Sequence, residues 1–121
     1  MQSFKKTWEI YASSWKTGTE AERQALYEQS LEAGCLYQDP LARAEGWEQL
    51  SAYMREFQGQ FPGASFRTTE FLTHNDQCIA RWEMVGDGGK VLSTGTSHAI
   101  FAPSGKLSRM TGFFEVPSAE A

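Results

Sequence analysis

Asp39 is the residue of this sequence whose type and position are best suited to chemistry, because it directly precedes Pro40. Proline pushes the preceding residue into extended geometry and brings no amide hydrogen, so a strand ends there and the carboxylate can turn into the interior. A carboxylate with apolar neighbours becomes a stronger base and can take a proton from carbon. An Asp-Pro pair is also an ordinary turn, so a solvated strand end is the alternative.

Tyr11 is the second candidate, because it belongs to an aromatic stripe at helical spacing. A phenol whose ring packs against apolar neighbours holds its hydroxyl in place and can stabilise a developing oxyanion. A tyrosine in such a stripe is also commonly a core residue with its hydroxyl at the edge. The stripe predicts a helix that ends near Gly18. Its residues are Phe4, Trp8, Tyr11 and Trp15.

Two further helices are expected. Thr19 and Glu22 have the spacing of a capping box, which predicts a helix from there to about Ala33, ended by a left-handed cap at Gly34. A short extended piece over 36–40 follows, and Pro40 ends it. Apolar residues then repeat at three- and four-residue steps and predict a third helix from Trp47 to Phe57, which the turn at 61–63 closes.

From residue 64 onward the hydrophobic period becomes that of strands. Polar and glycine-rich turns at 74–77, 86–89 and 103–105 divide this part into four strands joined as hairpins. The expected strands cover 66–73, 78–85, 91–102 and 107–116, and alternation along the first of them groups Phe66, Thr68, Glu70 and Leu72.

Three helices followed by four hairpin-connected strands predict one α+β domain over residues 1–121, with the helices covering one face of a strongly curved antiparallel sheet. A bent sheet cannot lie flat against helices, so we expect a cavity between them. An aromatic wall would favour a flat or bulky apolar ligand over a sugar or a nucleotide. The residues expected in this wall are Trp8, Trp15, Trp47, Phe57, Trp82, Met84, Phe101 and Phe114.

Composition excludes several other classes of function. The formal net charge is -4 and the basic residues are scattered, which argues against binding to nucleic acid. No apolar run is long enough to span a membrane, and no signal segment is visible, so we expect a cytoplasmic protein. Cys35 and Cys78 are expected to be buried thiols, and a disulfide between them is the alternative. Histidines, cysteines and acids show no metal-ligand spacing, and no motif implies a cofactor.

Four short motifs, in this order and spacing, resemble the nuclear transport factor 2-like superfamily, and within it the SnoaL-like and ketosteroid isomerase-like proteins. The resemblance spans roughly residues 4–116. It implies a cone-shaped α+β barrel with a deep hydrophobic pocket and frequent dimers formed through the sheet. The motifs are Tyr37-x-Asp39-Pro40, Phe61-Pro62-Gly63, Gly95-x-Ser97-His98 and Ser104-Gly105-Lys106.

The resemblance also implies roles for individual residues. Asp39 falls where ketosteroid isomerase-like enzymes keep the aspartate that moves a proton next to a carbonyl, and Tyr11 matches the tyrosine that donates to the substrate oxygen. Ser97 is a departure, because these isomerases have a protonated aspartic acid there; a serine hydroxyl donates one hydrogen bond but is no useful acid. His98 should point to the opposite side from Ser97, onto the outer face of the sheet.

Two hypotheses follow. The first is a cofactor-independent isomerase, cyclase or lyase that acts on a small hydrophobic carbonyl compound, with Asp39 as proton shuttle and Tyr11 as oxyanion donor. The second is a non-catalytic module of the same fold that binds a small ligand or forms dimers, and Ser97 in place of an acid favours it.

Overall fold

The computed structural model describes residues 2–16 and 18–116 and shows helices and strands interleaved in the first half of the chain. Two strands lie between the second and third helices, and four more follow the third helix. In chain order the elements are α1 (Phe4–Ser13), α2 (Glu20–Ser30), β1 (Leu31–Gln38), β2 (Arg43–Glu45), α3 (Gly46–Gln60), β3 (Ser65–His74), β4 (Gln77–Val85), β5 (Val91–Phe101) and β6 (Leu107–Phe113).

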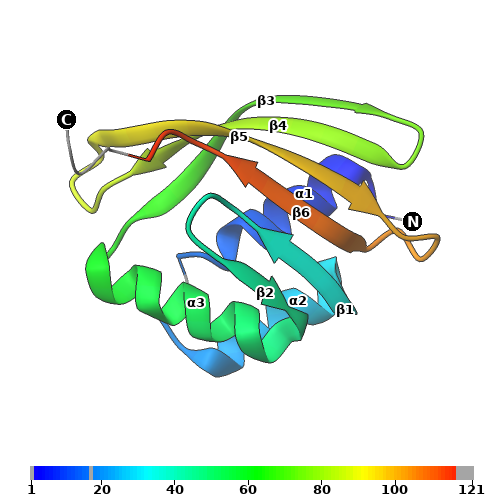
Figure 1. Ribbon diagram of the computed structural model, residues 1–121, viewed down its shortest axis with the longest axis horizontal. Helices are drawn as coiled ribbons and strands as arrows, with labels where there is room; N and C mark the ends of the chain where they lie inside the picture. Colours follow the sequence, from blue (N-terminus) through cyan, green and yellow to red (C-terminus); the bar gives the residue numbers. More distant parts are fainter. Residues whose placement is uncertain (1, 17, 117–121) are drawn as a thin grey trace.

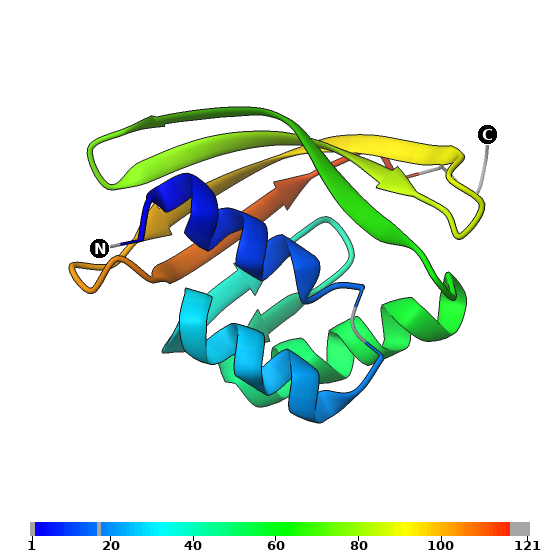
Figure 2. The same cartoon turned by 180° about the vertical axis from the view of Figure 1, so that it is seen from behind.

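The strands form one sheet in the order β2-β1-β6-β5-β4-β3. Neighbours are antiparallel, except that β1 and β6 are parallel. Figure 1 shows the sheet curled over the helices, and Figure 2 shows α1 in the hollow of the sheet with α2 and α3 on the same side. The predicted α+β class, with three helices on a strongly curved and mostly antiparallel sheet, is confirmed.

The second helix is shorter than the sequence predicts, because the chain enters the sheet at Leu31. Gly34 is therefore a strand residue and not a left-handed helix cap. Leu31 and Cys35 are buried, and β1 pairs with both β2 and β6, with an irregular register between 31 and 36. Pairing and burial outweigh the local helix tendency of this segment.

A bulge in β3 changes which of its residues face the helices. The register with β4 shifts between Thr68 and Glu70. One extra residue reverses the faces beyond it, so Phe71 packs against the core while Leu72 is 60% exposed. Alternation along the sequence had grouped Leu72 with Phe66, and the bulge is the reason that this grouping is wrong.

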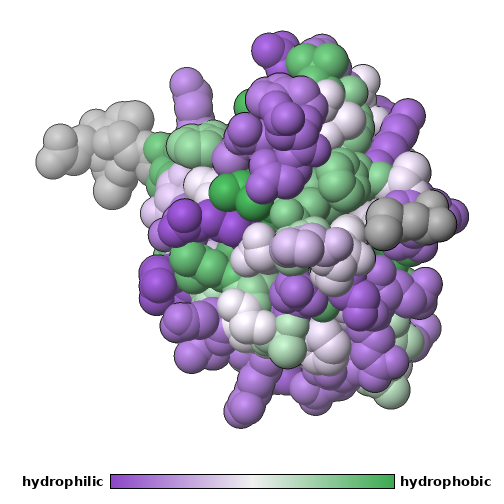
Figure 3. All heavy atoms as spheres, turned by 90° about the vertical axis from the view of Figure 1, so that its right-hand side faces the viewer, coloured by the Kyte–Doolittle hydropathy of each residue, from purple (hydrophilic) through white to green (hydrophobic). Residues whose placement is uncertain are grey.

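The core lies between the hollow of the sheet and the helices, and its largest fully buried side chains include Tyr27, Leu50, Met54 and Phe101. On the face shown in Figure 3, apolar and polar residues lie in small, intermixed groups. Within the described part of the chain, none of the helices combines the length and the apolar character that crossing a membrane requires.

Gly95 sets the position of Trp82 in the hollow of the sheet. The two residues are paired across β4 and β5, and the indole lies over the glycine. A Cβ atom on residue 95 would lie 2.3 Å from Cζ2 of Trp82 and 2.8 Å from the backbone oxygen of Phe113. Neither distance is tolerated in real structures, so any side chain at this position would displace the indole ring.

We expect Gly95→Ala to lower the free energy of unfolding by about 1–3 kcal/mol, because the added methyl group overpacks this site. Urea unfolding followed by tryptophan fluorescence measures the change. Gly88→Ala is the matched control, because a Cβ atom there meets nothing within 4 Å. Equal stability of the two variants would contradict the packing argument.

Candidate functional site

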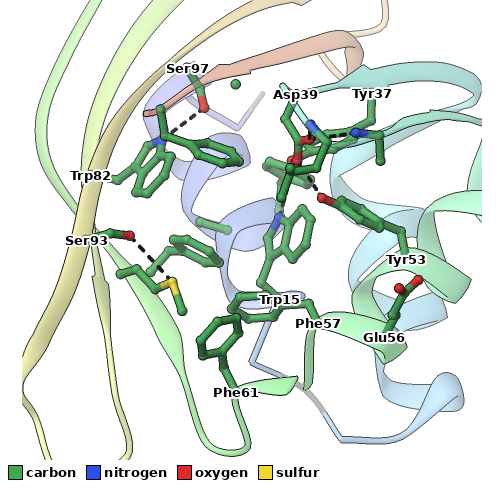
Figure 4. A pocket seen from close by; sticks show the side chains of 18 of the residues that line it. Trp15, Tyr37, Asp39, Tyr53, Glu56, Phe57, Phe61, Trp82, Ser93 and Ser97 are labelled. Atoms are coloured by element: carbon green, nitrogen blue, oxygen red, sulfur yellow. Dashed lines mark hydrogen bonds between the residues drawn. The ribbon is translucent and has the colours of Figure 1, made fainter. Parts of the chain in front are cut away.

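A cavity of about 490 Å³ lies between α1, α3 and the hollow of the sheet. This volume is typical of sites for small organic ligands. Figure 4 shows aromatic side chains converging on it from the helices and from the sheet. The aromatic residues of the wall are Trp8, Tyr11, Trp15, Tyr37, Tyr53, Phe57, Phe61, Phe66, Trp82 and Phe114.

Asp39 lies in the wall of this cavity, directly after β1, and its two carboxylate oxygens have different surroundings (Figure 4). Oδ1 accepts hydrogen bonds from the amides of Leu41 and Ala42, at 2.8 and 3.0 Å. Oδ2 accepts from the hydroxyls of Tyr37 and Tyr53, at 2.5 and 2.9 Å. One oxygen is thus held by a turn at the strand end, and the other is held by tyrosines of the cavity wall. The geometry therefore contains both a turn and an inward-facing carboxylate oxygen.

Tyr37 and Tyr53 hold Asp39 in place, and sequence reasoning did not single out either of them as a site residue. Tyr37 lies in β1, two residues before Asp39, and stands in the same short motif. Tyr53 comes from α3, within the predicted third helix. Burial and the hydrogen bond to Asp39 raise the pKa of both hydroxyls above the ordinary value. Both therefore stay protonated at neutral pH and donate to the carboxylate.

No cation balances Asp39 within the described residues. The only ion pair there joins Arg67 and Glu83, on β3 and β4. The lining of the cavity includes no lysine, arginine or histidine from residues 2–16 and 18–116. Four hydrogen-bond donors alone hold the carboxylate, which leaves its charge facing an apolar space.

Tyr11 also lines the cavity, and it is 3% exposed. Its hydroxyl oxygen accepts a hydrogen bond from Nε1 of Trp15 at 3.1 Å. A phenol can accept and donate at the same time, so its proton remains free for an acceptor inside the cavity. Burial raises the pKa of Tyr11, which keeps this hydroxyl a neutral donor.

Ser97 faces Asp39 across a glycine. Its Oγ accepts from Nε1 of Trp82 at 3.0 Å, which leaves its own proton available. Gly112 is paired with Ser97 on the neighbouring strand. A Cβ atom on Gly112 would lie 3.5 Å from Cβ of Asp39 and 3.8 Å from Oγ of Ser97. The missing side chain leaves room between the two polar groups.

The predicted wall is partly reproduced. Trp8, Trp15, Phe57, Trp82, Met84 and Phe114 line the cavity, and Trp47 and Phe101 do not. Trp47 lies in the first turn of α3 and packs on Tyr27 of α2, with ring centroids 5.9 Å apart. Phe101 shares the inward side of β5 but lies near its far end, stacked on Phe4 beside a second, smaller hollow.

The remaining titratable candidates lie elsewhere. His98 does not line the cavity, and its Nε2 is 2.8 Å from Oε1 of Gln77, so it points away from Ser97 as alternation predicts. Exposed His74 contacts Asn75 in the turn after β3. In the part of the chain that the structure describes, no three histidine, cysteine or acidic residues lie close enough to hold a metal ion.

Burial raises the pKa of Cys35 to about 11 and that of Cys78 to about 12, from an ordinary value of 9.0. The unfolded chain releases these protons at lower pH than the folded chain does. Above pH 9.0 the folded state therefore binds more protons, and stability must fall as pH rises.

We expect the urea midpoint to be constant around neutral pH and to fall progressively from about pH 9 to 11, because both thiols must stay protonated in the folded chain. Urea titrations in reductant at several pH values measure this. The double variant Cys35→Ala, Cys78→Ala should show a shallower decline. A decline of the same slope in that variant would assign the effect to other groups, such as the buried tyrosines.

Solved structures with this fold are numerous, although their sequences differ from this one. A SnoaL-like family protein from Agrobacterium tumefaciens, assigned as a candidate isomerase, has 22% identity and a TM-score of 0.83, over 91% of this chain and 95% of its own. A candidate SnoaL-like polyketide cyclase from Jannaschia sp. CCS1 has 15% identity and a TM-score of 0.74, over 93% and 85%. At these identities the likeness establishes the fold.

A third structure shows that a designed chain can adopt the same fold. It is a de novo designed protein with a curved β-sheet, with 16% identity and a TM-score of 0.72, over 95% of this chain and 88% of its own. No curated protein matches the sequence significantly.

The family comparison is more specific than the structural one. The model of the SnoaL-like domain matches residues 13–116, which include Asp39, Ser97, Gly112 and most of the aromatic wall. The match covers far more than half of the chain. The protein therefore belongs to the SnoaL-like domain family.

Proposed function

We propose that the chain binds a small hydrophobic carbonyl compound in the cavity and moves a proton at the carbon next to the carbonyl, without a cofactor. The observation that carries this proposal is the Asp39 carboxylate, which has no cationic partner among the described residues and presents Oδ2 to an aromatic cavity. An isomerase, a cyclase and a lyase of this kind share that first proton transfer.

In the proposed step, a C–H bond next to the carbonyl breaks and its proton goes to Asp39. The electron pair of that bond forms a carbon–carbon double bond, the carbonyl oxygen gains a negative charge, and the substrate becomes an enolate. Tyr11 and Ser97 each keep a hydroxyl proton that can be donated to this oxygen. Asp39 then returns the proton to carbon. In a lyase, the enolate instead re-forms the carbonyl, the bond from the adjacent carbon to a leaving group breaks, and Asp39 passes its proton to that group.

Tyr37 and Tyr53 act on the base in this proposal. Their hydrogen bonds to Oδ2 fix the orientation of the carboxylate. When Asp39 takes the proton it becomes a poorer acceptor, so both hydroxyls are freed to turn toward the new oxyanion. The two tyrosines are positioning residues for Asp39 before the transfer.

The assignments of two structural relatives support the proposed class of reaction. Structures from Agrobacterium tumefaciens and Jannaschia are assigned as a candidate isomerase and a candidate polyketide cyclase, two of the reaction classes proposed for this chain. The alternative is a binding module without catalysis. Its support is that Asp39 already accepts four hydrogen bonds and that Ser97 stands in the place of an acid.

Asp39→Asn should slow deuterium exchange at the carbon next to the carbonyl by at least about a hundredfold, because the amide cannot take the proton. We would measure exchange into 2-tetralone in D₂O by NMR, above the rate in buffer. Glu48→Gln is the matched control, since Glu48 is an exposed carboxylate outside the cavity lining.

Three outcomes separate the hypotheses. Undiminished exchange in Asp39→Asn would rule out the role of Asp39. Binding of the ketone by the parent chain without exchange would support the binding module. Failure of the parent chain to bind any small ring ketone would contradict the cavity as a site for hydrophobic carbonyl compounds.

We also propose that the outer face of the sheet pairs two copies of the chain. Leu72 and Ile79 are paired across β3 and β4 on this face, 60% and 39% exposed, and Phe113 on β6 is 59% exposed. Between them lies His98, paired with Ile79 on one side and with Thr111 on the other. Burying this apolar surface would favour association.

Light scattering should give the mass of two chains for the parent protein and of one chain for Phe113→Glu, because a charge at this position cannot be buried unpaired. Leu41→Glu is the control: Leu41 is 64% exposed but belongs to the turn between β1 and β2. A monomeric parent chain at high concentration would overturn the dimer.

A further inference from the structure

The charges of the cavity are all of one sign. Three carboxylates line it, those of Asp39, Glu56 and Glu115. No lysine, arginine or histidine of the described residues contributes to the lining. The polar groups that remain are hydroxyls, an amide and indole nitrogens, which carry no charge at neutral pH.

The three carboxylates differ in how deeply they are buried. Asp39 is half-buried in the wall beside Tyr37 and Tyr53. Glu56 is exposed, one turn of α3 beyond Tyr53, and lies near enough to help raise the pKa of that hydroxyl. Glu115 is exposed beyond the end of β6, next to Phe114, whose ring packs edge-on against Trp82 at 6.1 Å. Two of the three carboxylates are thus exposed to solvent, and the third is half-buried in the wall.

Aromatic rings form much of the wall, and those that turn their faces to the cavity would add to this field. The face of an aromatic ring carries negative partial charge and attracts cations. Trp15 lies in the middle of the wall, with the rings of Tyr37, Tyr53, Phe57 and Phe66 all within 5.8 Å. Apolar surroundings weaken screening, so the field of the carboxylates and the attraction of ring faces for cations are both stronger in the cavity than in water.

We infer that the cavity selects its ligand by charge: it admits a ring compound that is neutral or carries a protonated amine, and it excludes one that carries a carboxylate, sulfate or phosphate. This inference rests on the proposed function in one respect, that the same cavity is the ligand site. It narrows the substrate class to carbonyl compounds without an anionic group.

Three compounds with one bicyclic skeleton test the inference: 2-tetralone, 2-aminotetralin and tetralin-2-carboxylate. Quenching of tryptophan fluorescence gives their dissociation constants, because Trp8, Trp15 and Trp82 line the cavity. We expect the amine to bind at least roughly tenfold more tightly than the carboxylate, with the neutral ketone between them. Added salt should weaken the binding of the amine and leave that of the ketone unchanged.

Variants identify the charges responsible. The double variant Glu56→Gln, Glu115→Gln should narrow the ratio between amine and carboxylate, whereas Glu48→Gln, outside the cavity, should leave it unchanged. Equal binding of the amine and the carboxylate by the parent chain would overturn charge selection, and so would a ratio that the double variant does not alter.

The proposed function can fail separately. Binding in the expected order without deuterium exchange supports charge selection and contradicts proton transfer. Exchange of the ketone together with equal binding of the two charged compounds contradicts charge selection alone. If none of the three compounds binds, the cavity is not the ligand site and both proposals fall.

Discussion

The curvature of the sheet is the constraint on which the site depends. A sheet that bends over helices leaves more room than the core side chains fill. The registers of β1 and β3 are irregular, and irregularities of this kind increase the local bend and twist of a strand. The cavity that results is closed by α1 and α3 and walled by rings. Bulky aromatic residues suit this position, because they span the gap without filling it completely.

The carboxylate of Asp39 ties three elements together at one end of this cavity. It follows β1, binds the amides of the next turn through one oxygen, and accepts from a strand tyrosine and a helix tyrosine through the other. The same contacts that fix its position also occupy its lone pairs. In the proposed reaction, these hydrogen bonds would compete with the substrate proton for the same oxygen atoms.

The fold class was predictable from the sequence, because the change from helical to strand periodicity near residue 64 and the turns between strands are local signals. The position of Asp39 was predictable as well, since Pro40 ends its strand. The place of Gly34 in a strand and the outward orientation of Leu72 were not predictable, because strand pairing and a bulge depend on residues distant in sequence. Tyr53 was missed for the same reason: its hydroxyl matters only once α3 meets the end of β1.

Trp47 and Phe101 show a further limit of periodicity. Each has the residue type and the spacing expected of the wall, yet one faces α2 and the other lies beyond the cavity on its own strand. Spacing along an element indicates which side a residue takes. It does not indicate how far along that side the cavity extends, which the packing of the other elements decides.

Gly112 has a consequence for how activity can diverge within this fold. A methyl group there would touch its neighbours at ordinary van der Waals distances. The backbone would thus accept it, while the space between the carboxylate and the serine hydroxyl would shrink. Two chains could share every helix and strand and differ in the shape of the cavity through one carbon atom. Neither thermal stability nor superposition of the backbones would reveal that difference.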